Sequence, residues 1–337
     1  MARTLLTVIL NWRTAEMTLR ATAAARAAMK DLPGAITIVD NDSGDGSFER
    51  MSAEIEARGW DRGEIPVRVL QSGHNGGFGA GNNYGIRAGL PEGVRPDYVY
   101  ILNSDAFPEP DAIRALYQRL ETHPETGFAG SYIKGEDGLP HQTAFRFPSI
   151  ASEFEGSICF GPISRLLRRH IVPLPVPEET RRVDWLAGAS LMMRQDLLDR
   201  IGLFDETFFL YFEETELCQR VARAEMKIDY VRESEVVHIG SASTGMKTWR
   251  RMPSYWFDSR LYYFTKTRGR LYAFLATLAL ITGAGLWRLR MLIQRKDSVD
   301  PPKFLRDLIA HSLRAVMPGG RGRPSKPKRA QIQREGV

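Results

Sequence analysis

Four short strand-like runs alternate with helix-like segments in the first third of the chain, and this alternation limits the possible folds more than any other feature. The runs are rich in β-branched and aromatic residues, and polar or glycine-rich segments bound them. Such runs are typical of buried strands. Strands that alternate with helices predict parallel βαβ units, so we expect an α/β fold. The runs are Thr4–Leu10, Ala35–Val39, Val67–Leu70 and Tyr98–Leu102.

Polar residues follow the second and third of these runs. In an open α/β sheet, ligands bind outside the carboxyl ends of the strands. Asp40 and Asp42 follow the second run, where a carboxylate can accept from a base N–H or a ribose hydroxyl. An Asx-rich turn explains the same residues equally well. The glycines of Gly76–Gly81 let the backbone approach a phosphate, although they lack the strict dinucleotide-binding spacing.

Asp105 follows the fourth run and is the candidate metal ligand. Mg²⁺ or Mn²⁺ that bridges a donor diphosphate needs few protein carboxylates, because phosphates and water complete the coordination. The alternative is a turn, or an N-cap for the helix expected to start near Pro110.

Three acids within four residues follow an aromatic run later in the chain: Glu213, Glu214 and Glu216. Adjacent carboxylates beside a hydrophobic wall can raise one pKa and produce a general base. A solvated acidic helix start, favoured by the helix dipole, is the alternative. His238 ends a strand-like run, and a lone histidine there is more often structural than a ligand, unless it lies near Asp105.

The order of these motifs resembles that of glycosyltransferase family 2, and within it the rhamnosyltransferase-like branch with a GT-A fold. The resemblance covers about residues 4–245. The matching segments are Thr7-Val-Ile-Leu-Asn-Trp12, Val39-Asp-Asn-Asp-Ser-Gly-Asp-Gly-Ser47, Asn75-Gly-Gly-Phe-Gly-Ala-Gly-Asn-Asn-Tyr-Gly-Ile86, Leu102-Asn-Ser-Asp105, Pro110-Asp-Ala-Ile113, Asp184-Trp-Leu-Ala-Gly-Ala189, Gly202-Leu-Phe-Asp-Glu206, Phe208-Phe-Leu-Tyr-Phe-Glu-Glu-Thr-Glu-Leu-Cys218 and Val236-Val-His238.

The resemblance implies a GT-A-type, Rossmann-like mixed sheet flanked by helices. It also implies inverting transfer of a sugar, L-rhamnose being one candidate, from a nucleotide-diphosphate donor to a glycan or lipid-linked acceptor in cell-surface polysaccharide synthesis. By the same analogy Asp40 contacts the donor base, Glu214 takes the catalytic-base position beside Glu213, and Asp105 and His238 hold a divalent Mg or Mn ion. The donor-binding set implied is Asn11, Asp40, Asp42, Asn75, Gly76, Gly77, Asn82, Asn103, Ser104 and Asp105, and the acceptor side is Asp184, Trp185 and Gly188.

Two positions depart from the usual pattern of the family. The metal motif is commonly aspartate-X-aspartate, and here it is Asn103-Ser104-Asp105, with one carboxylate. The base position is commonly aspartate, and here it is Glu214, whose side chain is one methylene longer.

The C-terminal part carries the positive charge of the chain. Residues 1–257 hold 29 Lys/Arg and 35 Asp/Glu, a balance of −6, whereas residues 258–337 hold 17 and 5, a balance of +12. Residues 253–270 are aromatic and basic, and Leu271–Trp287 contains no charge. This pattern favours a helix in or at a membrane interface, with a buried helix of the soluble domain as the alternative.

These observations predict a GT-A catalytic domain over 1–250, a helical membrane-associating region over 251–317 and a disordered basic tail over 318–337. The two cysteines, Cys159 and Cys218, lack metal-ligand spacing, and no signal peptide is apparent. We therefore expect the cytoplasmic face of the inner (plasma) membrane, reached peripherally or through one short hydrophobic segment. The expected partners are a nucleotide-diphosphate sugar, a glycan or polyprenyl-linked acceptor and the membrane surface.

Two other classes of function were weighed. A nucleotidyltransferase would carry a glycine-rich basic loop after the first strand, and Asn11-Trp-Arg-Thr14 has no such glycines. The other alternative is a membrane-bound scaffold that binds a sugar nucleotide or glycan without turnover. Asn103 favours it, because it stands where the metal motif commonly has its first aspartate. Nucleic acid is not an expected partner, because the aromatic residues cluster beside the apolar segment rather than along the basic tail.

Overall fold

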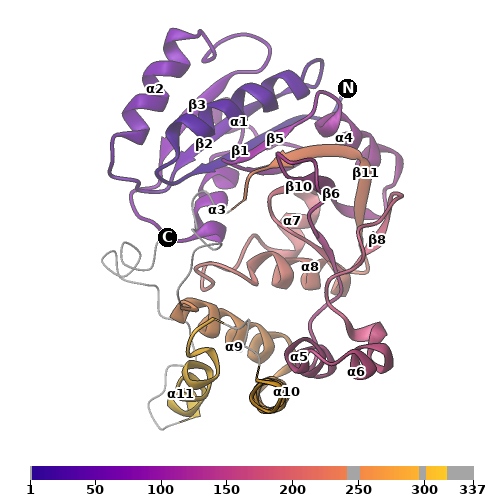
Figure 1. Cartoon of the computed structure of the whole chain (residues 1–337). Coiled ribbons are helices and arrows are strands. Elements are labelled where there is room, and N and C mark those ends of the chain that lie inside the picture. Colours follow the sequence, from indigo (N-terminus) through magenta and orange to yellow (C-terminus); the bar gives the residue numbers. More distant parts are fainter. Residues whose placement is uncertain (1, 241–250, 296–300, 317–337) are drawn as a thin grey trace. The chain divides into compact units, whose positions relative to one another are not determined.

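The computed structural model describes residues 2–240, 251–295 and 301–316 (Figure 1). The chain forms two compact units, each assembled from separate stretches. The first comprises Met1–Phe145, Pro175–Glu206 and Glu213–Ser243, and the second comprises Arg146–Leu174, Thr207–Phe212 and Thr244–Val337. The domain boundaries predicted at 250 and 317 stay a prediction, and the predicted tail 318–337 lies outside the described residues.

The helices and strands of the described residues have the following bounds. The strands are β1 Leu5–Asn11, β2 Gly34–Asp40, β3 Val67–Gln71, β4 Tyr98–Asn103, β5 Ala106–Pro108, β6 Thr126–Lys134, β7 Ala144–Phe145, β8 Arg181–Val183, β9 Trp185–Leu186, β10 Ser190–Arg194 and β11 Lys227–His238. The helices are α1 Ala15–Ala28, α2 Ser47–Ala57, α3 Phe78–Ala88, α4 Ala112–Thr122, α5 Ile150–Ile158, α6 Gly161–Leu166, α7 Gln195–Ile201, α8 Glu213–Arg223, α9 Ser254–Arg268, α10 Arg270–Gln294 and α11 Phe304–Val316. Two short 3₁₀ turns, η1 Pro91–Gly93 and η2 Arg168–His170, complete the set.

The first unit is built on a mixed sheet in the order β3-β2-β1-β4-β10-β6-β11-β5, with β8 on β11. The strands β1 to β4 run parallel, whereas β10 is antiparallel to both β4 and β6. Helices cover this sheet, and the predicted α/β class with a mixed sheet and flanking helices is confirmed.

The strand β1 is buried on both faces, which explains its continuous apolar sequence. Leu5 and Ile9 belong to one core cluster with residues of α1 and α4. On the opposite face α3 packs close to the sheet, because Gly85 has no side chain. A Cβ there would stand 2.7 Å from a methyl group of Val8 and 3.0 Å from one of Val39. The small residues of α3 therefore bring the helix after the glycine-rich loop against the strands that end at the site.

The segment 130–182 contains the end of β6 and the helices α5 and α6. Ser149 caps α5, and Ser152 returns the hydrogen bond to the backbone of Ser149. This capping box uses serine where glutamate or glutamine is the common signal, so the sequence does not reveal it. Residues Lys227–His238 form a single strand, β11, whose pairing with β6 has an irregular register between Val231 and Glu235.

In the second unit, the aromatic segment that precedes α8 in the sequence, Thr207–Phe212, packs on α9. The Phe208 ring lies 4.9 Å from that of Tyr262, and the Phe209 ring lies 5.5 Å from that of Tyr255. The Ser259 hydroxyl donates to the Leu210 carbonyl at 3.0 Å. The next residues, Tyr211 and Phe212, have φ angles of 70° and 69°, which non-glycine residues rarely adopt. The packing and hydrogen-bond contacts offset the conformational free energy that these positive φ angles cost.

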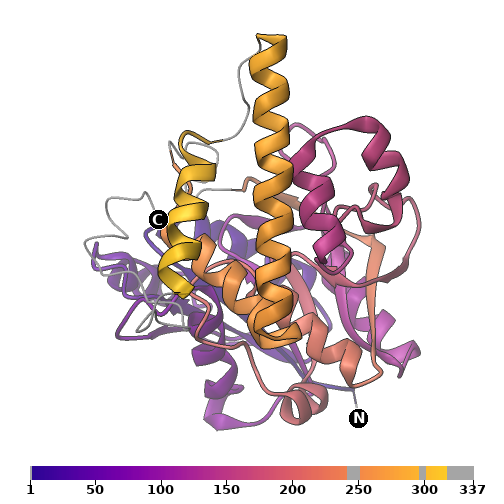
Figure 2. The ribbon, with the colours of Figure 1, turned by 90° about the horizontal axis from the view of Figure 1, so that it is seen from below.

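The helix α10 packs against α5 (Figure 2). The two helices meet at Gly283, where a Cβ would stand 2.0 Å from the Ser157 hydroxyl and 2.9 Å from the Phe154 carbonyl. Nearby, Arg260 of α9 is buried and donates to Glu153 of α5 at 2.8 Å and to Thr277 of α10 at 3.1 Å. Three helices of this unit therefore converge on one buried ion pair.

Replacing Gly283 by alanine is expected to destabilise the protein by about 1–3 kcal/mol, because the added methyl group overpacks the α5–α10 contact. The matched control is Gly285→Ala in the same helix, where a Cβ meets nothing within 4 Å. That change should stabilise the helix by about 0.5–1 kcal/mol. Urea denaturation of both variants measures the difference, and equal midpoints would contradict the close packing.

Candidate active site

The carboxyl ends of three neighbouring strands bring predicted donor-binding residues together. Asn11 ends β1 and stands in register with Asp40 at the end of β2. On the other side of β1, Leu10 is in register with Asn103 at the end of β4. The Asn11 side chain donates to Asp40 Oδ1 at 2.7 Å. This edge is where an open α/β sheet binds its ligands.

Asp40 is buried and fixed by the protein itself. Its carboxylate accepts from the Ser43 hydroxyl at 2.5 Å, from the Ser43 backbone N–H at 3.1 Å and from Asn11. The Asx-rich turn that is the alternative explanation is therefore present, with Asp40 bonded to the backbone three residues on. Asp42, in the same turn, is partly exposed with φ of 58°. Contact of either carboxylate with a donor stays a prediction.

The glycine-rich loop is held by an asparagine network. The Asn75 side-chain oxygen accepts from the Gly77 N–H and from the Asn41 amide, both at 3.0 Å. Gly77 has φ of 91°, a conformation that favours glycine, and α3 starts at the next residue. Gly76 is also confined, since a Cβ there would stand 2.6 Å from that of Ala80. Asn82, by contrast, is buried and donates within α3, to the Phe78 carbonyl.

Asp105 and His238 meet, although 133 residues separate them. The strand β5 begins just after Asp105 and pairs antiparallel with the end of β11, which sets His238 opposite Ala106. His238 Nε2 lies 3.0 Å from Asp105 Oδ1 and 3.4 Å from Asn103 Nδ2. The helix-cap alternative for Asp105 is wrong, because α4 begins at Ala112 with Asp111 at its N-cap.

The side chains at this point fit a divalent ion whose coordination would be completed by a bound ligand. Asp105 and His238 supply one carboxylate and one imidazole, and both side chains are largely buried. Within the described residues there is no group of three or more His, Cys, Asp or Glu side chains that would enclose a metal. Two protein ligands suit an ion whose other positions are filled by phosphate oxygens and water, as Mg²⁺ and Mn²⁺ commonly are.

Glu213, which is buried, and Glu214, which is partly exposed, open α8 as a pair of adjacent carboxyl groups. One oxygen of each, Oε2, is buried with no hydrogen-bond partner among the described residues. Burial, and then the charge of Glu214, raise the pKa of Glu213 well above its ordinary value. Burial also raises the pKa of Glu214, but the backbone N–H groups of Glu214 and Gly188 oppose the rise. A backbone N–H also opposes the rise for Glu213, so Glu214 differs from it by the additional N–H of Gly188 and is the candidate for the ionised member of the pair.

Glu216 has a different role from its two neighbours. It is buried and pairs with Arg220, one helical turn later, at 3.0 Å. The same guanidinium donates to the carbonyls of Gly202 and Leu203 at 2.8 and 2.7 Å. This pair fixes the loop before α8 and leaves Glu213 and Glu214 as the candidates for chemistry.

Of the predicted acceptor-side residues, Gly188 connects the carboxylate pair to the strand edge. Gly188 is buried, and a Cβ there would stand 3.0 Å from the Phe78 ring. The next carbonyl, of Ala189, accepts from the Asn103 N–H at 3.0 Å. The backbone at 188–189 thus contacts Glu214 on one side and the Asn103-Ser104-Asp105 motif on the other. Asp184 is exposed, and Trp185 stacks on Phe145 with ring centroids 4.1 Å apart.

Two residues near the site were not singled out from the sequence. The ring of His141 lies 6.2 Å from that of His238 in an edge arrangement. The Thr14 hydroxyl donates to the Ser104 hydroxyl at 3.2 Å, which ties the start of α1 to the metal motif. Neither residue belongs to a local pattern with a known chemistry, so only the fold reveals them.

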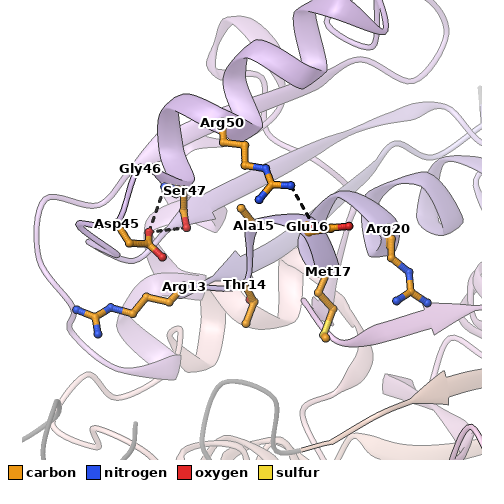
Figure 3. A pocket seen from close by; sticks show the side chains of 10 residues that line it. All are labelled: Arg13, Thr14, Ala15, Glu16, Met17, Arg20, Asp45, Gly46, Ser47 and Arg50. Atoms are coloured by element: carbon orange, nitrogen blue, oxygen red, sulfur yellow. Dashed lines mark hydrogen bonds and ion pairs between the residues drawn. The ribbon is translucent and has the colours of Figure 1, made fainter.

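A pocket of about 440 Å³ lies beside Thr14, between the starts of α1 and α2 (Figure 3). Three arginines line it, but each contacts the protein. Arg50 pairs with Glu16 at 3.1 Å, Arg13 donates to the Ser43 carbonyl, and Arg20 lies over the Phe107 ring. The pocket therefore adjoins the strand edge without offering an uncommitted cation.

The Glu213–Glu214 pair makes stability depend on pH. A carboxyl group whose pKa is raised by folding binds its proton more tightly in the native state, so it favours folding most below pH 4.5, its ordinary pKa, and loses this contribution as the pH rises. Glu213→Gln removes the titration. We expect the free energy of unfolding of the variant to exceed that of the wild type by an amount that grows above pH 4.5. Urea midpoints from pH 4 to 8 measure this, and parallel pH profiles would contradict it.

Comparison with known proteins gives the same family as the sequence motifs. An L-rhamnosyltransferase of Mycobacterium tuberculosis, named N-acetylglucosaminyl-diphospho-decaprenol L-rhamnosyltransferase, is 29% identical over 221 residues, 63% of this chain and 69% of the relative. The rhamnosyltransferase WbbL of Escherichia coli is 26% identical over 165 residues, 48% of this chain and 60% of the relative.

A solved structure shares the fold. The mannosyltransferase PcManGT of Pyrobaculum calidifontis, in complex with GDP-Man and Mn²⁺, aligns with 95% of this chain and 82% of its own, with a TM-score of 0.53 and 13% identity. The family described as glycosyltransferase like family 2 matches residues 3–260. With a match over that length and the site at the carboxyl edge of its sheet, the chain belongs to glycosyltransferase like family 2.

Proposed function

We propose that the protein transfers a sugar, with L-rhamnose as the first candidate, from a nucleotide-diphosphate donor to a lipid-linked glycan acceptor, with inversion at the anomeric carbon. The observation that carries the proposal is the placement of the Glu214 carboxylate and the Asp105–His238 pair on two sides of one backbone segment, 188–189. The rhamnosyltransferase relatives support the choice of sugar, and the printed decaprenol acceptor of one supports a lipid-linked acceptor.

Asp105 and His238 are assigned to the donor diphosphate. They would hold a Mg²⁺ or Mn²⁺ ion together with the phosphate oxygens. When bound, the ion supplies positive charge that offsets the charge of the leaving diphosphate. Asn103 and Ser104 lie beside them and keep the aspartate at the strand edge. The donor-side assignments of Asn11, Asp40, Asp42, Asn75, Gly76, Gly77 and Asn82 belong to the same proposal.

Glu214 is assigned as the general base. It takes the proton from the acceptor hydroxyl, whose oxygen then bonds to the anomeric carbon as the bond from that carbon to the diphosphate oxygen breaks. Attack from the side opposite the leaving group inverts the configuration. Glu213 is assigned as the protonated member, because burial and the neighbouring charge of Glu214 raise its pKa, and Glu214, which the Gly188 N–H also contacts, is assigned the negative charge. Asp184, Trp185 and Gly188 are assigned to the acceptor side.

The acceptor and the location form the last part of the proposal. Among the described residues, one helix, Arg270–Gln294, is long and apolar enough to cross a membrane. A lipid-linked acceptor is presented at a membrane surface, so attachment there would raise the local concentration of enzyme and substrate. We place the protein on the cytoplasmic face of the inner membrane, where nucleotide sugars are made.

A donor panel tests the proposal. The full-length protein is incubated with dTDP-, UDP- and GDP-sugars, Mg²⁺ or Mn²⁺, and a polyprenyl-diphosphate N-acetylglucosamine acceptor. We expect transfer from one donor class, dependence on the divalent ion, and a product whose anomeric configuration, read by NMR, is opposite to that of the donor. Donor binding without transfer to any acceptor would favour the scaffold class, and a retained configuration would overturn the mechanism.

A further inference from the structure

One face of α10 carries exposed apolar side chains in its first and last turns, with the exposed Thr282 between the two groups. Its side chains include Leu271, Leu289 and Leu292, with exposed fractions of 73%, 55% and 76%. We name this face the α10 stripe and define it by Leu271, Phe274, Leu275, Leu278, Leu286, Leu289, Leu292 and Ile293. The spacing of three and four residues places all of them on one side of the helix.

The stripe is long and its flanks are basic. Its 23 residues span about 35 Å at 1.5 Å per residue. With about 100° per residue, Arg270 and Arg288 fall about 90° to one side of the line through Leu271 and Leu278, and Arg290 falls about 110° to the other. The stripe is therefore free of charge. Arg270 and Arg288 border it on one side, where their long side chains can reach a polar surface, whereas Arg290 on the other side contacts the protein.

The opposite face of α10 is built into the second unit. It approaches α5 closely at Gly283, and Thr277 accepts a hydrogen bond from the buried Arg260. The Tyr272 hydroxyl accepts from the backbone N–H of Ile150, the first residue of α5. Near its end, Arg290 donates to the Cys159 carbonyl and lies over the Phe160 ring. The helix is thus anchored by polar contacts along most of its length.

These anchors distinguish lying on a membrane from crossing it. The helix is long enough to cross, but α5 carries Glu153 and Glu155, and Glu153 is paired with Arg260. A crossing α10 would have to carry those charges into hydrocarbon or separate from α5, and either is costly. Immersion of the stripe alone buries the apolar side chains and leaves every anchor in place.

The short helix α6 adds a second basic and apolar element to this surface. It begins next to Phe160, which Arg290 covers. Leu166 is 78% exposed, and the exposed Arg165, Arg168 and Arg169 surround it, with no acid between Phe160 and His170. Positive charge beside exposed apolar side chains is complementary to an anionic lipid surface.

We infer that α10 lies in the plane of the membrane surface, with its stripe immersed in an anionic lipid leaflet and α5 held on its other face. The inference rests on the proposed function in one respect: the proposed lipid-linked acceptor is the reason for the enzyme to bind a membrane. It is tested without substrate, so that loss of vesicle binding and loss of transfer are separate results.

The first test is flotation of the full-length protein with phosphatidylcholine vesicles that contain or lack phosphatidylglycerol. We expect binding that is stronger with the anionic lipid, and about tenfold or greater loss of binding in L278E/L289E, because binding follows the buried apolar area. The matched control is V94E/L139E, which adds the same charges at exposed apolar positions of the first unit. Thermal melting by circular dichroism shows that all variants are folded. Equal vesicle binding by the two double variants would overturn the inference. So would failure of the wild type to bind vesicles together with a wild-type dimer, seen in light scattering, that L278E/L289E dissociates.

The second test separates the in-plane and crossing arrangements. In a Cys159→Ser background, Arg270→Cys or Gln294→Cys places a thiol at one end of α10, and Cys218 is buried. A membrane-impermeant maleimide added outside vesicles that carry the bound protein should label both ends to the same extent. Labelling of one end with protection of the other would show a crossing helix and refute the in-plane arrangement.

Discussion

Glu214→Gln is expected to lower the rate of sugar transfer by about 100- to 10,000-fold, the usual contribution of a general base. Glutamine keeps the size of the side chain and can still pack beside Gly188, but it cannot take the acceptor proton. Donor binding should survive, because the donor is assigned to the Asp105 side of the site. Radiolabelled transfer measures the rate, and calorimetry measures donor affinity.

Glu213→Gln is the matched control for this result. The same substitution one residue earlier mimics the protonated carboxyl group that we assign to Glu213, whose pKa burial raises. Transfer should stay within about tenfold of the wild type, less than the usual contribution of a general base. If Glu213→Gln is the inactive variant, the roles of the two carboxyl groups are reversed. If Glu214→Gln loses donor binding, its carboxylate belongs to the donor site and not to the acceptor.

Asp105→Asn should reduce transfer by about 100- to 1,000-fold, since charge stabilisation by a bound ion is worth several kcal/mol. Asparagine can still hydrogen-bond to His238, so the strand pairing that brings the two residues together should persist. The affinity for donor should also lose its dependence on Mn²⁺. Calorimetric titration of the donor with and without Mn²⁺ measures this directly.

Asp111→Asn provides the comparison for Asp105→Asn. Asp111 is an exposed aspartate six residues later, at the N-cap of α4, and the substitution removes the same charge. Its transfer rate and Mn²⁺ dependence should match the wild type. Equal behaviour of the two variants would mean that Asp105 holds neither the ion nor the diphosphate, and the donor assignment would fall.

The strand edge could be predicted from the sequence because its signals are local. The apolar runs of β1, β2 and β4 each end on the polar residue that reaches the site, namely Asn11, Asp40 and Asn103. The parallel order of the strands follows from the helices between them. The partner of Asp105 is different, because the short pairing of β5 with β11 brings His238 to it across 133 residues. No spacing in the sequence encodes that distance.

The different roles of the three acids of α8 could be inferred from the sequence only through their spacing to an arginine. Glu213, Glu214 and Glu216 look equivalent as a cluster, yet only Glu216 has an arginine four residues later, a spacing that pairs side chains on one helix face. The packing of α10 on α5 is harder to anticipate. Its apolar composition suits a membrane span, and only the glycine at 283, facing α5, reveals that one side is covered by protein.

The interleaving of the two units has a consequence for synthesis of the chain on the ribosome. The Glu153 side chain of α5 emerges 107 residues before its ion-pair partner Arg260. At a synthesis rate of about 5–20 residues per second, α9 follows α5 out of the ribosome after about 5–20 s, and α10 follows later still. During that interval its apolar residues are open to non-native association. A nascent chain stopped before α9 should therefore aggregate or recruit chaperones, and a C-terminal truncation within this region would create a folding defect rather than a soluble catalytic fragment.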